Sequence, residues 1–121
     1  AILEDEPDAA RLLRRILQTR GDYEIFEACD GKSGLELIRS VHPDVVLLDL
    51  MMPRIDGFEV LEALEADEEL RRIPVVVVTA KTLTTSERER LGGRMEALLE
   101  KGDFTDQDLL GRVLGAMDDE D

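Results

Sequence analysis

Two short runs of this chain are apolar at every position, and they constrain its fold more than any other feature. Residues 45–48 lie between two aspartates, and residues 75–78 follow Pro74. A strand with one face in water alternates apolar and polar residues, so continuous runs of this length predict strands buried on both faces. Such strands belong to parallel sheets covered by helices on both sides. The sequence therefore predicts an α/β fold.

Helical patterns follow each strand-like run along the chain. The expected strands, each with its following helix, are 1–3 with 7–20, 23–29 with 31–42, 45–48 with 57–66, 75–78 with 85–91, and 97–99 with 106–117. Asp30 is suited to cap the second helix, and Thr84–Glu87 and Thr105–Asp108 have the spacing of capping boxes. The connections are short. We predict one open α/β domain over residues 1–117, followed by an acidic tail at 118–121.

Charge and rare residues exclude several functions. Twenty-nine acidic against 15 basic residues give a net charge of -14, which nucleic acid or an anionic membrane surface would repel. A single cysteine (Cys29) and a single histidine (His42) cannot form an internal disulfide or a Cys/His zinc site. Cys29 is expected to pack at the end of the second strand. Apolar runs are too short to span a membrane and no signal-peptide pattern opens the chain, so a cytoplasmic location is expected.

Polar side chains follow four of the predicted strands. Glu4 and Asp5 follow the first, Asp49 the third, Thr79 the fourth and Lys101 the fifth. Ligands of open parallel sheets bind beyond the carboxyl ends of the strands. If the first and third strands are neighbours, their carboxylates share one pocket, where Mg2+ would offset their repulsion. Carboxylates, a hydroxyl and an ammonium group together suit phosphoryl transfer, with an aspartate as nucleophile.

These residues lie in motifs that resemble those of a known family. Segments 3–7 (Leu-Glu-Asp-Glu-Pro), 44–57 and 78–80 (Val-Thr-Ala), together with Lys101, resemble in order and spacing the receiver domain of two-component response regulators. The block 44–57 is the most specific of them. The resemblance covers essentially the whole chain. It implies a flavodoxin-like, doubly wound (βα)5 domain with five parallel strands in the order 2-1-3-4-5.

The resemblance also implies a role for each site residue. Asp49 would be the phosphoacceptor, Thr79 would bind a phosphoryl oxygen, and Lys101 would pair first with the acceptor carboxylate and then with the phosphoryl group. The implied Mg2+ ligands are Glu4, Asp5, Asp49 and the backbone carbonyl of Met51. The phosphoryl donor would be a phosphohistidine on a histidine kinase or a histidine phosphotransfer protein. This domain itself would contact neither nucleic acid nor membrane.

The sequence departs from the family pattern at three places. Leu98 stands where the family usually has an aromatic switch residue, so rotation of an aromatic ring cannot signal activation here. Gly102 replaces the usual proline after the lysine, and we expect a trans peptide bond there. The segment 84–91 is short and nearly all polar, which predicts a mobile helix. The pattern over 87–104 looks like that of receivers attached to hybrid histidine kinases.

Two further positions bear on the lifetime of a phosphorylated state. The resemblance places Met51 and Lys81 beside the water that hydrolyses the acyl phosphate. An apolar side chain and a long cationic one can shield Asp49 from this water, which predicts slow dephosphorylation.

Alternative functions remain open from the sequence. A degenerate receiver could act as an interaction scaffold without phosphorylation. An aspartyl phosphatase would usually carry a second aspartate where Met51 stands. The Gly-Lys-Ser of residues 31–33 lacks the first glycine of a P-loop, since Phe26 occupies that position. His42, which a phosphotransfer module would phosphorylate, is predicted to be a surface loop residue.

Overall fold

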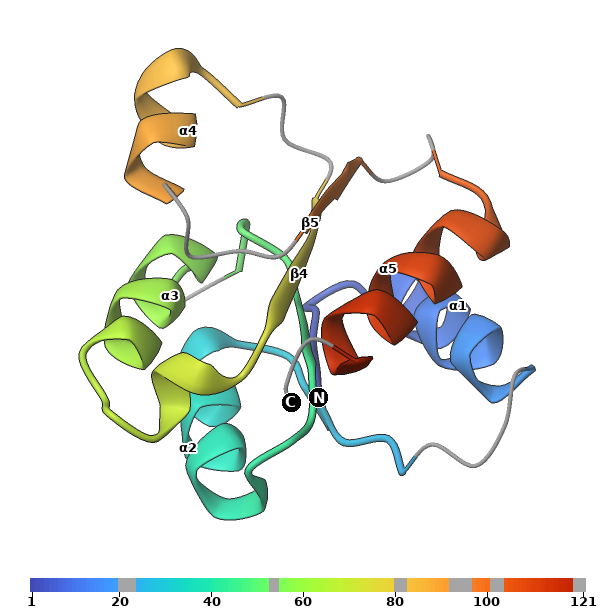
Figure 1. The fold of residues 1–121 in the computed structure, drawn as a ribbon, viewed down its shortest axis with the longest axis horizontal. Coiled ribbons are helices and arrows are strands. Elements are labelled where there is room, and N and C mark those ends of the chain that lie inside the picture. The colour runs from blue at the N-terminus through green and yellow to red at the C-terminus, as the bar shows by residue number, and fades with distance from the viewer. Residues whose placement is uncertain (20–23, 53–54, 80–82, 92–96, 101–103, 119–121) are drawn as a thin grey trace.

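The computed structural model describes residues 1–19, 24–52, 55–79, 83–91, 97–100 and 104–118 (Figure 1). The strands are β1 (Ile2–Leu3), β2 (Glu27–Ala28), β3 (Val46–Leu48), β4 (Val75–Thr79) and β5 (Ala97–Glu100). The helices are α1 (Pro7–Gln18), α2 (Gly31–Val41), α3 (Gly57–Glu65), α4 (Thr85–Leu91) and α5 (Asp106–Asp118), with a 3-10 turn, η1 (Leu70–Arg72), between α3 and β4.

The five strands form one sheet in the order β2-β1-β3-β4-β5, and every pair is parallel. Leu3 of β1 pairs with Leu48 of β3, and Leu48 pairs with Val77 of β4. The predicted order 2-1-3-4-5 is therefore confirmed. Because the strands run the same way, their carboxyl ends meet at one edge of the sheet.

Helices cover both faces of the sheet, as the apolar runs predict. Figure 1 shows α1 and α5 on one face and α2, α3 and α4 on the other. Successive side chains of a strand point to opposite faces. In β3, accordingly, Val46 and Leu48 pack into the core on the α2/α3 side, whereas Leu47 packs into the core on the α1/α5 side. The molecule thus has two apolar cores separated by the sheet.

Side-chain caps fix where the helices begin. Asp30 accepts a hydrogen bond from the Ser33 backbone N–H at 2.8 Å, which confirms the predicted cap of α2. Both predicted capping boxes are also confirmed, with the reciprocal hydrogen bonds of each pair at 2.9–3.1 Å: Thr84 with Glu87, and Thr105 with Asp108. Local sequence therefore sets the first turns of α2, α4 and α5.

Three local features differ from the sequence-based expectations. The second strand spans only Glu27–Ala28. Its neighbour β1 is itself two residues long, so only two residues of β2 can pair with it. The turn η1 was not predicted. Cys29 is exposed rather than packed. His42 is an exposed C-cap with φ 51°, in agreement with a surface position.

None of the described helices is both long and apolar enough to cross a bilayer.

Candidate functional site

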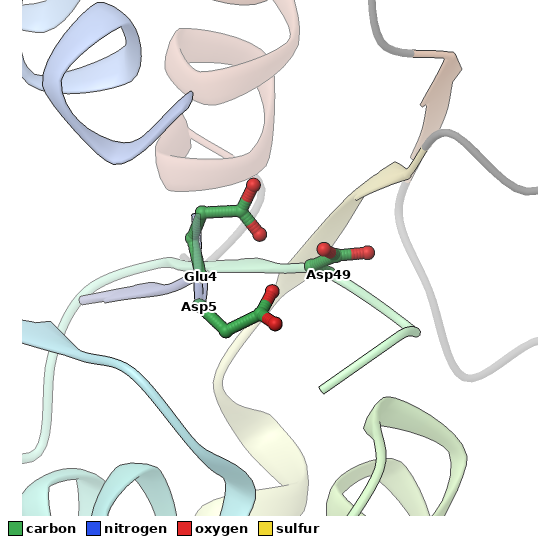
Figure 2. Close-up of side chains that lie close together, drawn as sticks. All are labelled: Glu4, Asp5 and Asp49. Carbon is green, nitrogen blue, oxygen red and sulfur yellow. The ribbon is translucent and has the colours of Figure 1, made fainter. Parts of the chain in front are cut away.

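Three carboxylates converge at the carboxyl edge of the sheet, two from the residues after β1 and one from the residue after β3. One oxygen from each of Glu4, Asp5 and Asp49 lies within 4.8 Å of the other two (Figure 2). Glu4 and Asp49 are each only 4% exposed, whereas Asp5 is exposed. The sequence predicted that these residues share a pocket if the two strands are neighbours, and β1 and β3 are neighbours.

The strand register explains this convergence. The Asp49 backbone N–H donates to the Leu3 carbonyl at 3.0 Å, so Asp49 lies level with the first residues beyond β1. The Glu4 N–H donates to the Ala28 carbonyl at 3.0 Å on the other side of β1. Backbone ladders on both sides therefore hold the two buried carboxylates at fixed positions.

A divalent cation fits the chemistry of this cluster. Carboxylates this close together repel one another, and burial of two of them removes the water that would screen the repulsion. The donors are all hard oxygens, and one acid remains exposed, so there is room for metal-bound water on that side. Mg2+ prefers a few carboxylates and retained waters. The residues present therefore fit Mg2+.

The backbone after Asp49 orients the Asp49 carboxylate. The Met51 N–H donates to Asp49 Oδ1 at 3.1 Å, which brings the backbone of Met51 beside the cluster. The Met51 side chain is 57% exposed. The backbone of Met51 thus contacts Asp49, while its side chain remains open to solvent.

Gly57 lets α3 begin directly against this backbone. A Cβ atom at Gly57 would lie 2.5 Å from Leu50 Cα and 2.6 Å from the Asp49 carbonyl oxygen, too close for any other residue type. The Gly57 N–H donates to the Leu50 carbonyl at 3.1 Å. The first turn of α3 therefore packs on the segment that carries Asp49.

Thr79 ends β4 at the same edge and is fully buried. Since Val77 pairs with Leu48, Thr79 lies one residue further along the strands than Asp49. In the other direction Thr79 pairs with Glu100 of β5. Lys101 and the Lys101–Gly102 peptide bond lie outside the described residues, as does Lys81.

One feature beside the cluster was not predicted. A groove of about 820 Å3 runs from Glu4 and Asp5 between α1 and α2. Arg14 of α1 and Glu27 of β2, both in its wall, form an ion pair. Nothing in the sequence links Arg14 to Glu27, a residue thirteen positions away on another element.

A doubly wound parallel sheet with an acidic cluster after its first and third strands defines a receiver-type domain. The family model "Response regulator receiver domain" matches residues 1–114. The chain belongs to the response regulator receiver domain family, and with that the family resemblance of its motifs is confirmed.

Curated relatives agree with this assignment. The chain is 38% identical over 100 residues to the polar-differentiation response regulator DivK of Brucella ovis, covering 83% of this chain and 80% of that protein. It is 32% identical over 116 residues to hybrid signal transduction histidine kinase D of Dictyostelium discoideum. That match covers 96% of this chain but 7% of the kinase.

Solved structures share the fold. The signal receiver domain of a signal transduction histidine kinase from Syntrophus aciditrophicus superposes with a TM-score of 0.86 at 25% identity, covering 98% of this chain and 88% of that one. The Mn2+-bound form of response regulator Rcp1 gives a TM-score of 0.76 at 28% identity, covering 94% and 87%.

Proposed function

We propose that this receiver domain accepts a phosphoryl group on Asp49 from a phosphohistidine. The donor is a histidine kinase or a histidine phosphotransfer protein, and the reaction requires Mg2+. The observation that carries the proposal is the buried Asp49 carboxylate within 4.8 Å of two further carboxylate oxygens. A buried acid of this kind is suited to be a nucleophile rather than a solvated surface charge.

The proposed metal ligands are Glu4, Asp5, Asp49 and the Met51 backbone carbonyl. When bound, Mg2+ would supply positive charge to the phosphoryl oxygens and offset the repulsion among the carboxylates. The donor set of this chain supports the assignment, and a related receiver, Rcp1, has been crystallised with Mn2+.

Four residues of this chain would each have a role in the transfer of the phosphoryl group. An Asp49 carboxylate oxygen forms a bond to phosphorus while the P–N bond to the donor histidine breaks, and the imidazole leaves with the electron pair. The Met51 N–H holds the other side of the carboxylate in place, as its contact with Oδ1 indicates. Thr79 and Lys101 then bind the new phosphoryl oxygens, with the hydroxyl donating a hydrogen bond and the ammonium neutralising charge.

The product would act as a signal by changing an interaction surface. Engagement of Thr79 would draw in the segment that follows β4, and the face formed by α4, β5 and α5 would change with it. Faster or slower amide exchange across residues 83–91 and 97–98 after phosphorylation is the expected sign, and unchanged rates would contradict it. We place this activity in the cytoplasm, without contact of the domain to nucleic acid or membrane.

Intact mass spectrometry tests the proposal. The protein is incubated with phosphoramidate, with and without Mg2+, beside Asp49→Asn and a control, Asp44→Asn. Asp44 is an exposed aspartate at the other end of the same strand. We expect one Mg2+-dependent phosphoryl adduct in the parent and the control and none in Asp49→Asn. Absence of the adduct from all three, with phosphoramidate and with a phosphorylated kinase, would instead support the scaffold function.

A further inference from the structure

Helix α4 buries little of itself. Of its seven residues only Leu91 is buried, while the remaining side chains are exposed or partly exposed. Isolated helices of this length are marginal in water, so contacts with the rest of the protein must hold α4 in place. Leu91, which packs into the core on the α2/α3 side, is one such contact.

Arg90 supplies a second contact, with α3. Its Nε and Nη2 atoms lie 3.0 and 2.9 Å from Glu62 Oε1, and its guanidinium carbon lies 4.8 Å from the centroid of the Phe58 ring. Phe58 and Glu62 are four residues apart on α3 and so lie on the same face of that helix. One planar group therefore stacks on a ring and pairs with a carboxylate one turn further on, as only arginine can.

The face of α3 that Arg90 contacts is next to the acidic cluster. Phe58 follows Gly57, whose Cα packs against the backbone of Asp49 and Leu50. The ring of Phe58 is buried, so its position follows that of the first turn of α3. A continuous series of contacts thus runs from Asp49 through Gly57 and Phe58 to Arg90.

We propose that Arg90 is a clamp that holds α4 on α3, so that the position of α4 is set from the first turn of α3 and hence from the backbone of Asp49. The clamp itself is a property of the unmodified domain. Only its consequence, that phosphorylation at Asp49 reaches α4 by this route, rests on the proposed function.

Amide hydrogen exchange of the full chain, followed by NMR, tests the clamp. In Arg90→Ala the amides in the last turn of α4 should exchange about five- to tenfold faster, while those of β3 and β4 stay unchanged. Arg88→Ala is the matched control, because Arg88 is an exposed arginine in the same turn and its loss has the same effect on the helix dipole. Equal rates in Arg90→Ala and Arg88→Ala would overturn the proposal.

Two further variants separate the clamp from a general loss of stability. Arg90→Lys keeps the charge but not the planar group, so its exchange rate should lie between those of the parent and Arg90→Ala. Glu62→Gln removes the other half of the ion pair. The double variant Arg90→Ala/Glu62→Gln should exchange no faster than Arg90→Ala, since both changes break the same contact. If the exchange rate of the double variant instead rises by the product of the two single-variant factors, the clamp is contradicted.

The route to Asp49 is tested in the phosphorylated protein. Phosphorylation should change α4 exchange in the parent and change it less in Arg90→Ala, whereas equal changes in the two proteins would rule out the route. If no phosphoryl adduct forms, the proposed function fails, yet the exchange rates of the unmodified variants still decide whether the clamp exists.

Discussion

Asp49 and Glu4 show how a few backbone hydrogen bonds can hold charged groups in an apolar sheet. Each is 4% exposed, and each follows a strand whose neighbours fix its register through bonds of 3.0 Å. Isolated buried carboxylates would destabilise the fold by several kcal/mol each. Their close placement therefore disfavours folding, and the divalent cation proposed above would offset this repulsion.

At Met51 and Lys81, we predict control over the lifetime of the phosphorylated state. Met51 is 57% exposed two residues after Asp49, and we propose that both positions lie beside the water that would hydrolyse the phosphorylated state. The double variant Met51→Asn/Lys81→Glu should lose its phosphoryl group severalfold faster, because polar side chains can position that water. Loss of the adduct with time, followed by intact mass, measures the rate. An unaltered half-life would contradict the prediction, and Leu12→Asn, an exposed apolar residue on α1, serves as control.

Asp67 is predicted to make stability depend on pH in the acid range. Its Oδ1 accepts hydrogen bonds from the Leu70 and Glu69 N–H groups at 3.1 and 2.9 Å, and these bonds lower the pKa of the carboxyl below its usual 3.8. A lowered pKa contributes stability above the unfolded-state pKa, and this contribution is lost as the pH falls through the folded-state value. In urea unfolding, the advantage of the parent over Asp67→Asn should therefore shrink as the pH falls below about 4. A difference in unfolding free energy that does not change with pH, or the same trend in Glu68→Gln, would argue against the lowered pKa of Asp67 as the cause.

Helix α5 carries two glycines for which the described part of the chain shows no packing requirement. At Gly111 and Gly115 an added Cβ would meet no atom within 4 Å. Interior glycines weaken helices because they lose more backbone entropy on folding. Gly111→Ala and Gly115→Ala should each raise the free energy of unfolding by about 0.5–1 kcal/mol, as measured by urea denaturation. Gly57→Ala should do the opposite, since its Cβ would meet the backbone of Leu50 and Asp49.

Elements with local signals were predictable from the sequence, and elements that depend on neighbours were not. The caps at Asp30, Thr84 and Thr105 involve residues three apart, so a short window contains both partners. The extent of β2 depends on its neighbour β1 and could not be read from its own residues. The contact of Arg90 with Glu62 joins positions 28 residues apart and needs the packed helices. In the site, the proximity of Glu4, Asp5 and Asp49 was predictable, but the groove beside them was not.

For the whole molecule, the net charge of -14 makes cation binding and stability interdependent. Mg2+ that binds only the folded state stabilises it by about 1.4 kcal/mol at ten times its dissociation constant. We predict a rise in melting temperature with MgCl2 beyond that with NaCl of equal ionic strength, since NaCl only screens the general repulsion. Without Mg2+, Asp5→Asn should melt at a higher temperature than the parent, because one repelling charge is gone. With MgCl2, its melting temperature should rise less than that of the parent. Equal rises in both proteins would show that Mg2+ binds elsewhere.

The division of the core by the sheet has a consequence for how such a domain can diversify. Neighbouring positions of one strand, such as Leu47 and Leu48, serve different helix layers. A substitution in one layer is expected to disturb mainly the side chains of that layer, and the three carboxylates follow the strands rather than belonging to either layer. Descendants of one ancestral gene can therefore acquire new partners by drift and selection on one layer at a time, while the chemistry at the strand ends is inherited intact.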